Sequence, residues 1–406
     1  MTLKPVLGET AAVAQTIHGT NVHDRFFPDH VLRSQEFAAC GGDLFGLFEE
    51  MEEKDGHLFS ALQTRKNGLL ARQRYIAPAG ETDAERRVAD FVEDVLNAIP
   101  HFAQTLQHIL DAIGKGFSVQ EVMWCVRPDG KIGIREIKSR YPGRFIFDAQ
   151  GNLCLTRSQH IMRPWNQTVP AQALPERKFL VCTFGGQYSN PYGKGLLARA
   201  FWYYWFKKNN LRYWLIYNER FGIPLTVARC GQALPEDERN RLLEVLETLQ
   251  NDTGILLPEN VTLEFIESRN GAGGATYRDF ADWCNDEISK IVLGQTLTSG
   301  EGRRSGSLAL GRVHDQVRNE YIESDARDLM EVINGQLIPW IVDFNFAPGT
   351  PCPRGTVDLS KDDNLDQEIE IDRRLIALGV PLSSEYFYER YHRPAPRDKE
   401  RALRYD

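Results

Sequence analysis

The sequence predicts an α+β protein in which long helices join separate groups of short strands. Apolar residues recur with a helical period from Gly195 to Phe221, which predicts one helix roughly 40 Å long. Short segments of alternating polarity, separated by turn pairs such as Asp129-Gly130, fill residues 118–184 and indicate an antiparallel sheet. A further strand–helix–strand pattern lies in residues 223–268.

Length and charge limit the possible classes of function. A chain of 406 residues suggests about two to three domains, and with 42% hydrophobic residues it can bury sizeable cores. The formal net charge is −8, which excludes a nucleic-acid binder that relies on a strongly basic surface. Any contact with DNA would therefore need local basic groups or enclosure of the DNA.

Metal and membrane sites are not expected. The seven cysteines are scattered without zinc-ligand spacing, which is typical of reduced thiols in a cytosolic protein. The first residues lack the apolar run of a signal peptide. The richest apolar segment, residues 200–206, is far shorter than the roughly twenty residues that span a bilayer.

In the first half of the chain, no regular pattern precedes Met51, where a helix is predicted to begin. Residues 72–78 then look like a strand. Thr82 can cap the next helix, because acidic residues fill the first turn after it. Another helix is predicted over residues 102–113. The short strand segments that follow are predicted within residues 118–126, 131–139, 144–157 and 178–184, with a further turn at Gln150-Gly151-Asn152.

The long helix from Gly195 is expected to end at Gly222 and Pro224. In the small unit after it, a helix begins at Pro235, where acidic residues follow the proline. The strands of this unit are predicted over residues 225–230, 254–258 and 261–267.

Two more long helices are predicted, over residues 276–292 and 307–338. Gly311 is expected to bend the second of them near its start, and Pro339 to end it. The charged tail after residue 359 looks helical and ends in a polar stub.

Residues 295–308 read QTLTSGEGRRSGSL, a glycine-rich loop between two predicted helices. A dinucleotide-binding loop follows a strand, and the Walker motif needs a Lys-Ser or Lys-Thr pair, so neither pattern of nucleotide binding is present. The loop is then either a flexible connection or a mobile carrier of the cations Arg303 and Arg304. Two roles are open for these arginines: either they contact a polyanion, or they pair with acidic residues such as Glu301 and Asp315.

Residues 200–206 read AFWYYWF and place aromatic side chains on every side of the predicted helix. A helix that is apolar all round is buried all round. It is therefore either the core helix of one domain, or a ring helix that contacts its own domain and two neighbouring subunits. Lys207 and Lys208 interrupt the apolar run, which fits a helix with one face on a solvent channel.

Catalytic patterns are absent from the sequence. The nine histidines are scattered, and His314, near Asp315 and Glu320 on a predicted helix, is interpreted as a solvated side chain. Neither G-x-S-x-G nor H-E-x-x-H occurs. We therefore expect no catalytic residues, no metal and no cofactor, and an enzyme is the minor alternative.

Five segments carry a family resemblance through their order and spacing. They are DGHLFSALQTRKNGLL, LDAIGKGFSVQEVMW, NPYGKGLLARAFWYYWFKKNNLRYWLIYNERFGIP, ISKIVLGQTLTSG and LIALGVPLSSEYFYERY. Together they resemble the portal proteins of tailed bacteriophages, specifically the Mu-type portal family. The resemblance implies a ring, usually of twelve subunits, at one vertex of the phage head. DNA enters through its channel during packaging and leaves through it on infection.

The resemblance also implies a domain plan, by the order of the segments. The wing (α/β) covers residues 1–194 and 339–360, the stem helices 195–222 and 275–293, the small α/β clip 223–274, the tunnel loop and kinked tunnel helix 294–338, and a crown-like helical segment 361–406. This last segment is shorter than the family leads us to expect, so a truncated crown is predicted.

Site residues and partners follow from the same resemblance. Residues expected to face DNA on the tunnel loop are Thr298, Ser299, Glu301, Arg303, Arg304 and Ser305. Lys207 and Lys208 are expected to face the channel, and Glu236, Asp237, Glu238 and Arg239 of the clip to face terminase or a connector.

The implied partners are further copies of the chain (a dodecamer), the terminase large subunit, head–tail connector or adaptor proteins, scaffold and major capsid protein, and transiently double-stranded DNA. No membrane is implied. The expected location is the portal vertex of the virion, and the host bacterial cytoplasm during assembly. The alternatives are another ring or connector protein of the phage head and, more distantly, a nucleotide-dependent enzyme.

Overall fold

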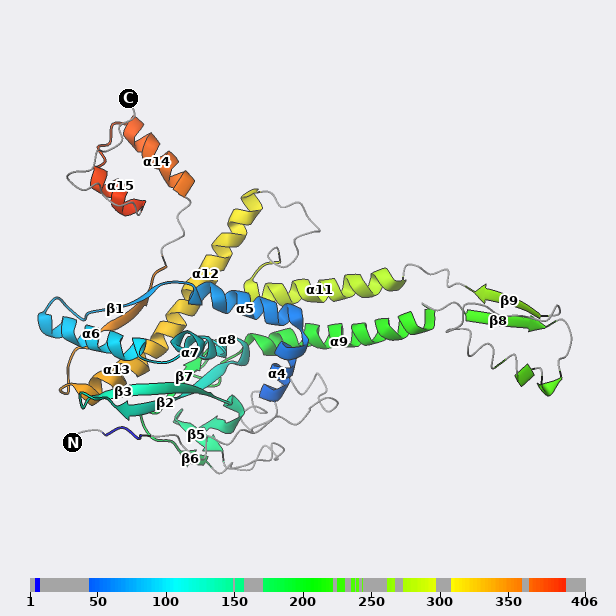
Figure 1. Ribbon diagram of the computed structural model, residues 1–406, viewed down its shortest axis with the longest axis horizontal. Coiled ribbons are helices and arrows are strands. Elements are labelled where there is room, and N and C mark those ends of the chain that lie inside the picture. Colours follow the sequence, from blue (N-terminus) through cyan, green and yellow to red (C-terminus); the bar gives the residue numbers. More distant parts are fainter. Residues whose placement is uncertain are drawn as a thin grey trace. The chain divides into compact units, whose positions relative to one another are not determined.

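The computed structural model confirms the α+β class and divides the chain into two units, Met1–Val357 and Asp358–Asp406. It describes residues 4–7, 44–148, 150–156, 171–221, 225–230, 235–237, 239–240, 243, 261–266, 273–296, 308–359 and 365–391. Figure 1 shows the labelled helices and strands.

The sheets of the first unit are antiparallel, as the turn pairs predict. β2 (Phe117–Val126) lies between β3 (Ile132–Arg140) and β7 (Phe179–Thr183), with a bulge in the β2–β3 ladder between Met123 and Trp124. A second sheet has the order β4 (Phe145–Phe147), β5 (Leu153–Thr156), β6 (Ala171–Ala173). A two-stranded sheet joins β1 (Arg74–Ala77) to β10 (Arg354–Val357), and so joins distant parts of the chain.

Two hydrophobic cores flank β2, because its side chains alternate between the two faces of the sheet. Val122 and Trp124 pack into one core, and Phe117 and Val119 into the other. The first core is closed by α6 (Asp83–Asn97), α7 (Phe102–Ile109), α12 (Leu308–Val332) and α13 (Ile338–Asn345). The second is closed by α4 (Leu44–Lys54), α5 (Gly56–Leu70), α9 (Leu196–Phe221) and α11 (Gly273–Leu293). β2 is therefore buried on both faces along most of its length.

Caps explain where several helices begin. Thr82 caps α6 as predicted, in a capping box with Glu85. The prediction that a helix begins at Met51 is wrong, because α4 already begins at Leu44. Asp55 then caps a separate helix, α5, by accepting the backbone N–H groups of its first turn.

Two predicted helix ends differ in the structure. The helix expected over residues 102–113 is divided into α7 and the short α8 (Ala112–Lys115). The helix expected to end at Pro339 continues through a π-helical turn at Ile333–Leu337 into α13. Pro339 lies in the first turn of α13, where a missing N–H costs little, and Gly311 lies within regular α-helix.

α9 and α11 run side by side, and both extend beyond the sheets on the same side of the first unit (Figure 1). Residues 225–230 form β8 as predicted, and β8 pairs antiparallel with β9 (Val261–Ile266). The predicted strand at 254–258 lies outside the described residues. In the second unit, Asp372 of α14 (Leu365–Ala377) accepts hydrogen bonds from Tyr386 of α15 (Ser384–Arg390) and from Tyr391.

Candidate functional site

The root of the glycine-rich loop is the best-defined site in the described part of the chain. α11 ends at Leu293 and α12 begins at Leu308. The tunnel-loop residues predicted to face DNA all fall between these helices and lie outside the described residues: Thr298, Ser299, Glu301, Arg303, Arg304 and Ser305. The structure does describe how the last turn of α11, which leads into the loop, is held.

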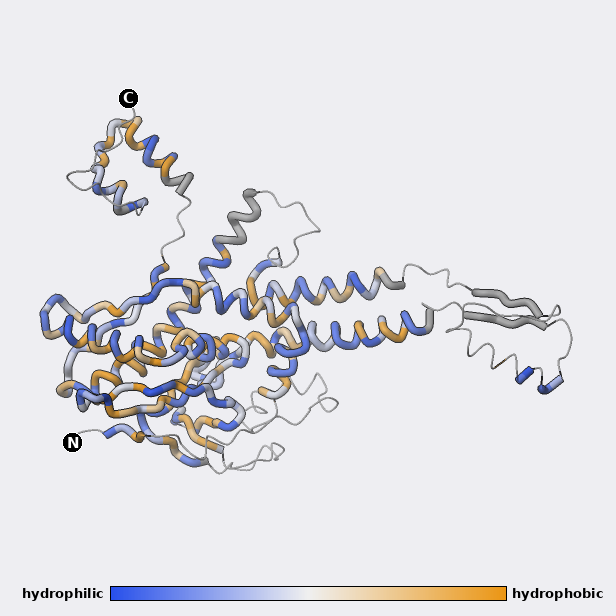
Figure 2. The backbone as a smooth tube through the Cα atoms, in the orientation of Figure 1, coloured by the Kyte–Doolittle hydropathy of each residue, from blue (hydrophilic) through white to orange (hydrophobic). Residues whose placement is uncertain are grey.

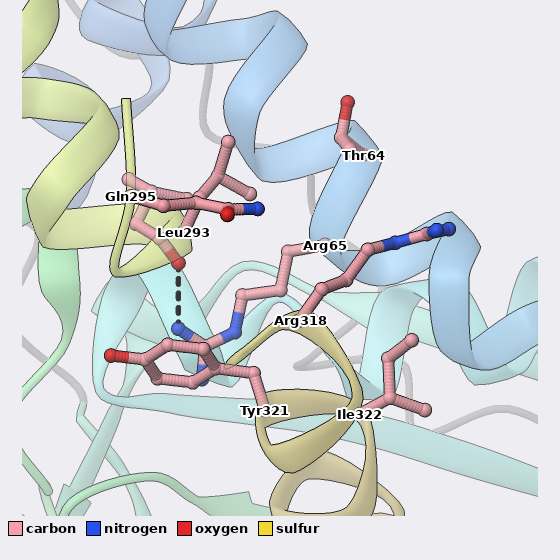
Figure 3. Close-up of a pocket in the computed structure, with 8 residues that line it drawn as sticks. Thr64, Arg65, Leu293, Gln295, Arg318, Tyr321 and Ile322 are labelled. Atoms are coloured by element: carbon pink, nitrogen blue, oxygen red, sulfur yellow. Dashed lines mark hydrogen bonds between the residues drawn. The ribbon is translucent and has the colours of Figure 1, made fainter. Parts of the chain in front are cut away.

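Arg65 of α5 connects the last turn of α11, where the loop begins, to the C-terminal half of α12. Its Nε and Nη2 donate to the two carboxylate oxygens of Asp325 on α12, at 2.7 and 2.8 Å. Its Nη1 donates to the backbone carbonyl of Val292 at 2.8 Å, in the last turn of α11 (Figure 3). That carbonyl has no partner within its own helix. One buried guanidinium therefore ties α5, α11 and α12 together.

Two further residues fix the geometry around Arg65. The ring of Tyr321 lies 4.4 Å from the guanidinium carbon, a distance that allows a cation–π contact. Gly294 has a φ of +69°, and a Cβ atom there would lie 2.4 Å from the Tyr321 ring. Only glycine fits this conformation and this close approach, so the first turn of the loop is set by Gly294.

A cavity of about 20 Å³ lies beside Arg65, lined by Leu293, Gln295, Arg318 and Tyr321 among others (Figure 3). The Gln295 side-chain oxygen is buried, and no described residue donates to it. A space of this size holds about one water molecule. It is far too small for a nucleotide, which agrees with the absence of a phosphate-binding motif at this loop.

A second polar cluster joins α5 to the α9–α11 pair. The ammonium group of Lys207 lies 2.6 Å from the Asp55 carboxylate and 2.7 Å from the Asn285 side-chain oxygen, and its side chain is 13% exposed. Lys208 lies 3.0 Å from Glu50 and is 44% exposed. Lys207 thus holds the subunit's own helices together. That both lysines face a channel stays a prediction, for which Lys208 is the better candidate.

His57 belongs to the same cluster. Its Nε2 lies 2.8 Å from the Ser289 hydroxyl on α11. Burial lowers the pKa of His57 below its ordinary value of 6.5, and the positive charge of Lys207 acts in the same direction. The carboxylates of Asp55 and Asp286 oppose that shift without cancelling it.

This shift predicts a loss of stability in mild acid. Because the folded pKa of His57 is lowered, the unfolded chain binds more protons between that pKa and 6.5. The free energy of unfolding should therefore fall as pH drops below 6.5. His57→Gln, which gains no proton, should show a smaller fall between pH 7.5 and pH 5.5 in urea unfolding. Equal falls in both proteins would contradict the assignment.

The predicted clip residues are exposed where they are described. Glu236, Asp237 and Arg239 are all solvent-exposed, whereas Glu238 lies outside the described residues. In sequence they lie between β8 and β9, which pair with each other.

The aromatic helix is only partly buried in one subunit. Ala200, Phe201 and Tyr204 are buried, but Phe206 is 36% exposed. Beyond it, large apolar side chains of α9 and α11 face solvent: Leu211 at 41%, Tyr213 at 59%, Leu215 at 65%, Ile216 at 38%, Phe280 at 38% and Trp283 at 47% exposure. Figure 2 shows these hydrophobic stretches alternating with hydrophilic ones along the two helices. Leu211 and Leu215 share one side of α9, whereas Tyr213 and Ile216 point to other sides of it. We call the exposed apolar surface made by all six side chains the stem apolar face.

Among the described residues, no three His, Cys, Asp or Glu side chains are grouped so as to hold a metal ion. No described helix has the length and hydropathy needed to cross a bilayer. Two features stand out among the described residues: the buried Arg65–Asp325 pair beside the loop, and the exposed apolar side chains of α9 and α11.

The family model described as the portal protein of Mu bacteriophage matches residues 45–393. The chain belongs to this family. It is 28% identical over 371 residues to the portal protein of Escherichia phage Mu, covering 86% of this chain and 66% of that protein. It is 26% identical over 377 residues to the Mu-like prophage FluMu protein gp29 of Haemophilus influenzae, covering 90% of this chain and 70% of that protein.

Solved structures share the fold of this chain. A chain from the neck of a native gene transfer agent particle, computed with C12 symmetry, matches with a TM-score of 0.55 at 12% identity, over 92% of this chain and 96% of that one. A chain from the virion of the native particle matches with a TM-score of 0.55 at 12% identity, over 87% and 94%. Membership of the family supports a role as a portal connector.

Sequence reasoning missed the residues that hold the loop root. Arg65 and Asp325 are 260 positions apart, so no local pattern pairs them. One signal was available: a charged residue, Arg65, falls at the helical spacing of Leu58, Leu62 and Leu69, on the face of α5 that is buried. Such a charge needs a buried partner.

Proposed function

We propose that this chain is the subunit of a portal ring, in which twelve copies enclose a channel for packaging and ejecting phage DNA. The observation that carries the ring is the stem apolar face. Monomeric proteins rarely expose a large apolar surface on one pair of elements. Burying a fully exposed side chain of this kind contributes about 1.5–3 kcal/mol. These six are 38–65% exposed, so each gains about half of that on association, and together they favour it.

A head-to-tail contact closes into a ring when its rotation divides a full turn. The C12 symmetry stated for the related neck particle supports twelve copies as the number proposed here. In such a ring, the α9–α11 pair of one subunit packs against the same pair of its neighbours. The family membership favours a portal over another ring protein of the phage head.

The proposed ring has a predicted particle mass, and a double variant of the stem apolar face should prevent it from assembling. Light scattering should give about twelve times the 46.3 kDa of one chain. Leu215→Glu combined with Trp283→Glu places two charges in the stem apolar face and should yield monomers. Tyr75→Glu, on β1 and 54% exposed, is the control and should leave the ring intact. Wild-type chains that stay monomeric in crowded and scaffold-supplemented solution would contradict the ring.

Passage of DNA requires weak contacts. A channel that neutralised many phosphates would bind DNA tightly through counterion release, and translocation would stall. A subunit of net charge −8 with two loop arginines meets that requirement. We propose that Arg303 and Arg304 form a belt of cations in the channel, on a loop that begins at the last turn of α11, which Arg65 holds. No step of this function needs a cofactor or catalysis by the chain.

The clip is proposed to bind terminase and, later, the head–tail connector. Its exposed charges support this role. Reversing Glu236 and Glu238 to lysine should weaken binding of the terminase large subunit about tenfold or more, since opposed charges at an interface become like charges. Rings should still form. Asp90→Lys with Glu93→Lys, on the exposed face of α6, is the matched control. Lost rings with normal terminase binding would show that these residues serve assembly instead.

The other proposed partners are the scaffold and the major capsid protein, which would meet the part of the ring outside the channel. The proposed location is the portal vertex of the virion, with the host bacterial cytoplasm as the site of assembly.

A further inference from the structure

The outer edge of β3 borders an open groove that the portal role does not use. The groove has a volume of about 630 Å³ and lies between α7 and β3. Six consecutive residues of β3, Arg135 to Arg140, line one side of it. Consecutive residues of a strand point to opposite faces, so a groove lined by all six follows the edge of the strand.

Backbone hydrogen-bonding groups face this groove. The N–H of Val122 donates to the carbonyl of Lys178 on the far side of β2, and Val122 lies opposite Ile137. In an antiparallel ladder, Val122 and Ile137 therefore form a non-hydrogen-bonded pair, and Ile137 directs its N–H and C=O away from β2. Ser139, two residues on, does the same. No described residue pairs with these groups.

Other edge positions of the same sheet are closed by side-chain amides. On β7, the side chain of Gln336 accepts from the N–H of Val181 and donates to its carbonyl. At the start of β3, Asn345 does the same for Ile132. Proteins close sheet edges because an open edge pairs with other chains. Within the described residues, the stretch from Ile137 to Ser139 has no such closure.

The groove carries surplus positive charge, although the chain as a whole is acidic. Three cations, Arg135, Lys138 and Arg140, line the groove with one carboxylate, that of Glu136. Arg135 and Lys138 lie 3.5 and 3.7 Å from the same oxygen of Glu136. Arg135 keeps 60% of its side chain exposed. Arg140, also on the groove, extends the row of cations, though it is paired with the buried Glu121.

An unpartnered acceptor lies immediately behind the groove. Gln120 is fully buried and stands opposite Ser139 in the ladder. Its amide nitrogen donates to the carbonyl of His108, a groove residue, but no described residue donates to its oxygen. A buried acceptor of this kind favours a donor from outside.

We propose that this groove binds an extended, acidic segment of another protein, which adds to β3 as a further strand. Backbone groups of the segment would pair with Ile137 and Ser139, and its carboxylates would meet Arg135 and Lys138. A second copy of this chain is the less suitable occupant, because its uncovered apolar side chains lie on α9 and α11 instead. The proposal does not depend on the portal ring.

The test uses the intact chain and a fluorescent, capped seven-residue peptide of alternating valine and glutamate. The peptide should bind at low ionic strength, and a peptide with lysine in place of glutamate should bind at least about tenfold more weakly. Hydrogen exchange in residues 132–140 should slow when the acidic peptide is bound. Equal binding of the two peptides, or no binding, would overturn the proposal.

Two variants locate the binding. Ser139→Pro removes an outward N–H without touching the β2 ladder, and should weaken the acidic peptide about tenfold. Should that variant fold poorly, Arg135→Glu with Lys138→Glu tests the same groove by charge. Its matched control is Arg86→Glu with Arg87→Glu on the exposed face of α6, which should bind normally. Normal binding by the groove variants overturns the proposal. The proposal is also overturned if the amide hydrogens of residues 132–140 are already protected from exchange in the free chain at low concentration. It is overturned as well if they become protected as the chain concentration rises, because that result assigns the edge of β3 to a second copy of the chain.

Discussion

Replacing Arg65 by methionine is expected to lower the free energy of unfolding by about 3–5 kcal/mol, the range for breaking a buried ion pair. The side chains of Arg65 and Asp325 are 4% and 1% exposed, so the variant leaves a carboxylate buried without its cation. It also leaves the Val292 carbonyl at the end of α11 without its donor. Urea unfolding, followed by circular dichroism, measures the loss.

The controls separate the buried pair from charge in general. Lys290→Met removes an exposed partner of Glu287 on α11 and should cost less than about 1 kcal/mol. The double variant Arg65→Met with Asp325→Leu should recover part of the lost stability, because neither charge is then buried alone. A loss below about 1 kcal/mol for Arg65→Met would contradict the role of Arg65 as the brace of the loop root.

The second large effect is on DNA packaging. Arg303→Ala with Arg304→Ala should leave ring assembly intact and reduce the DNA packaged or retained several-fold, because every subunit of the ring loses both cations. For DNA binding by isolated rings, the slope of log K against log salt should become shallower by about 0.9 for each phosphate that the variant no longer neutralises. Lysine at both positions keeps the charge and should package close to normally.

The competing explanation is that these arginines pair with acids nearby. Exposed pairs with Glu301 or Asp315 would each be worth about 0–1 kcal/mol, so their loss would leave packaging near normal. Packaging at the wild-type level in physiological salt would end the DNA-contact proposal. The loop would then be a flexible connection between α11 and α12.

Elements with a strong local signal were predictable from the sequence. α9 runs from Leu196 to Phe221, within a residue of the predicted bounds, because its period and the Gly222–Pro224 stop are both local. The cap at Thr82 needs only the acidic turn that follows it. The strands of the main sheet were found through their turns, although burial of β2 on both faces depends on helices far away in the chain.

Elements whose ends depend on packing were predicted less well. The break between α7 and α8 and the continuation past Pro339 are set by the core around β2, where Ile109, Ile113, Leu337 and Ile338 are all buried. A proline normally ends a helix, but one in the first turn after a π-helical segment is tolerated. Neither feature has a distinct local signal.

The sequence by itself determined the α+β class, the long helices, the acidic balance and the order of segments that marks the portal family. These properties follow from periodicity, caps and composition, which are read along the chain. Only the tertiary structure decided that Arg65 joins the last turn of α11 to α12, that Lys207 is held by Asp55, and that the edge of β3 is open. The reason is physical: a buried charge is stabilised by whichever partner the fold brings to it, and sequence separation says nothing about that partner.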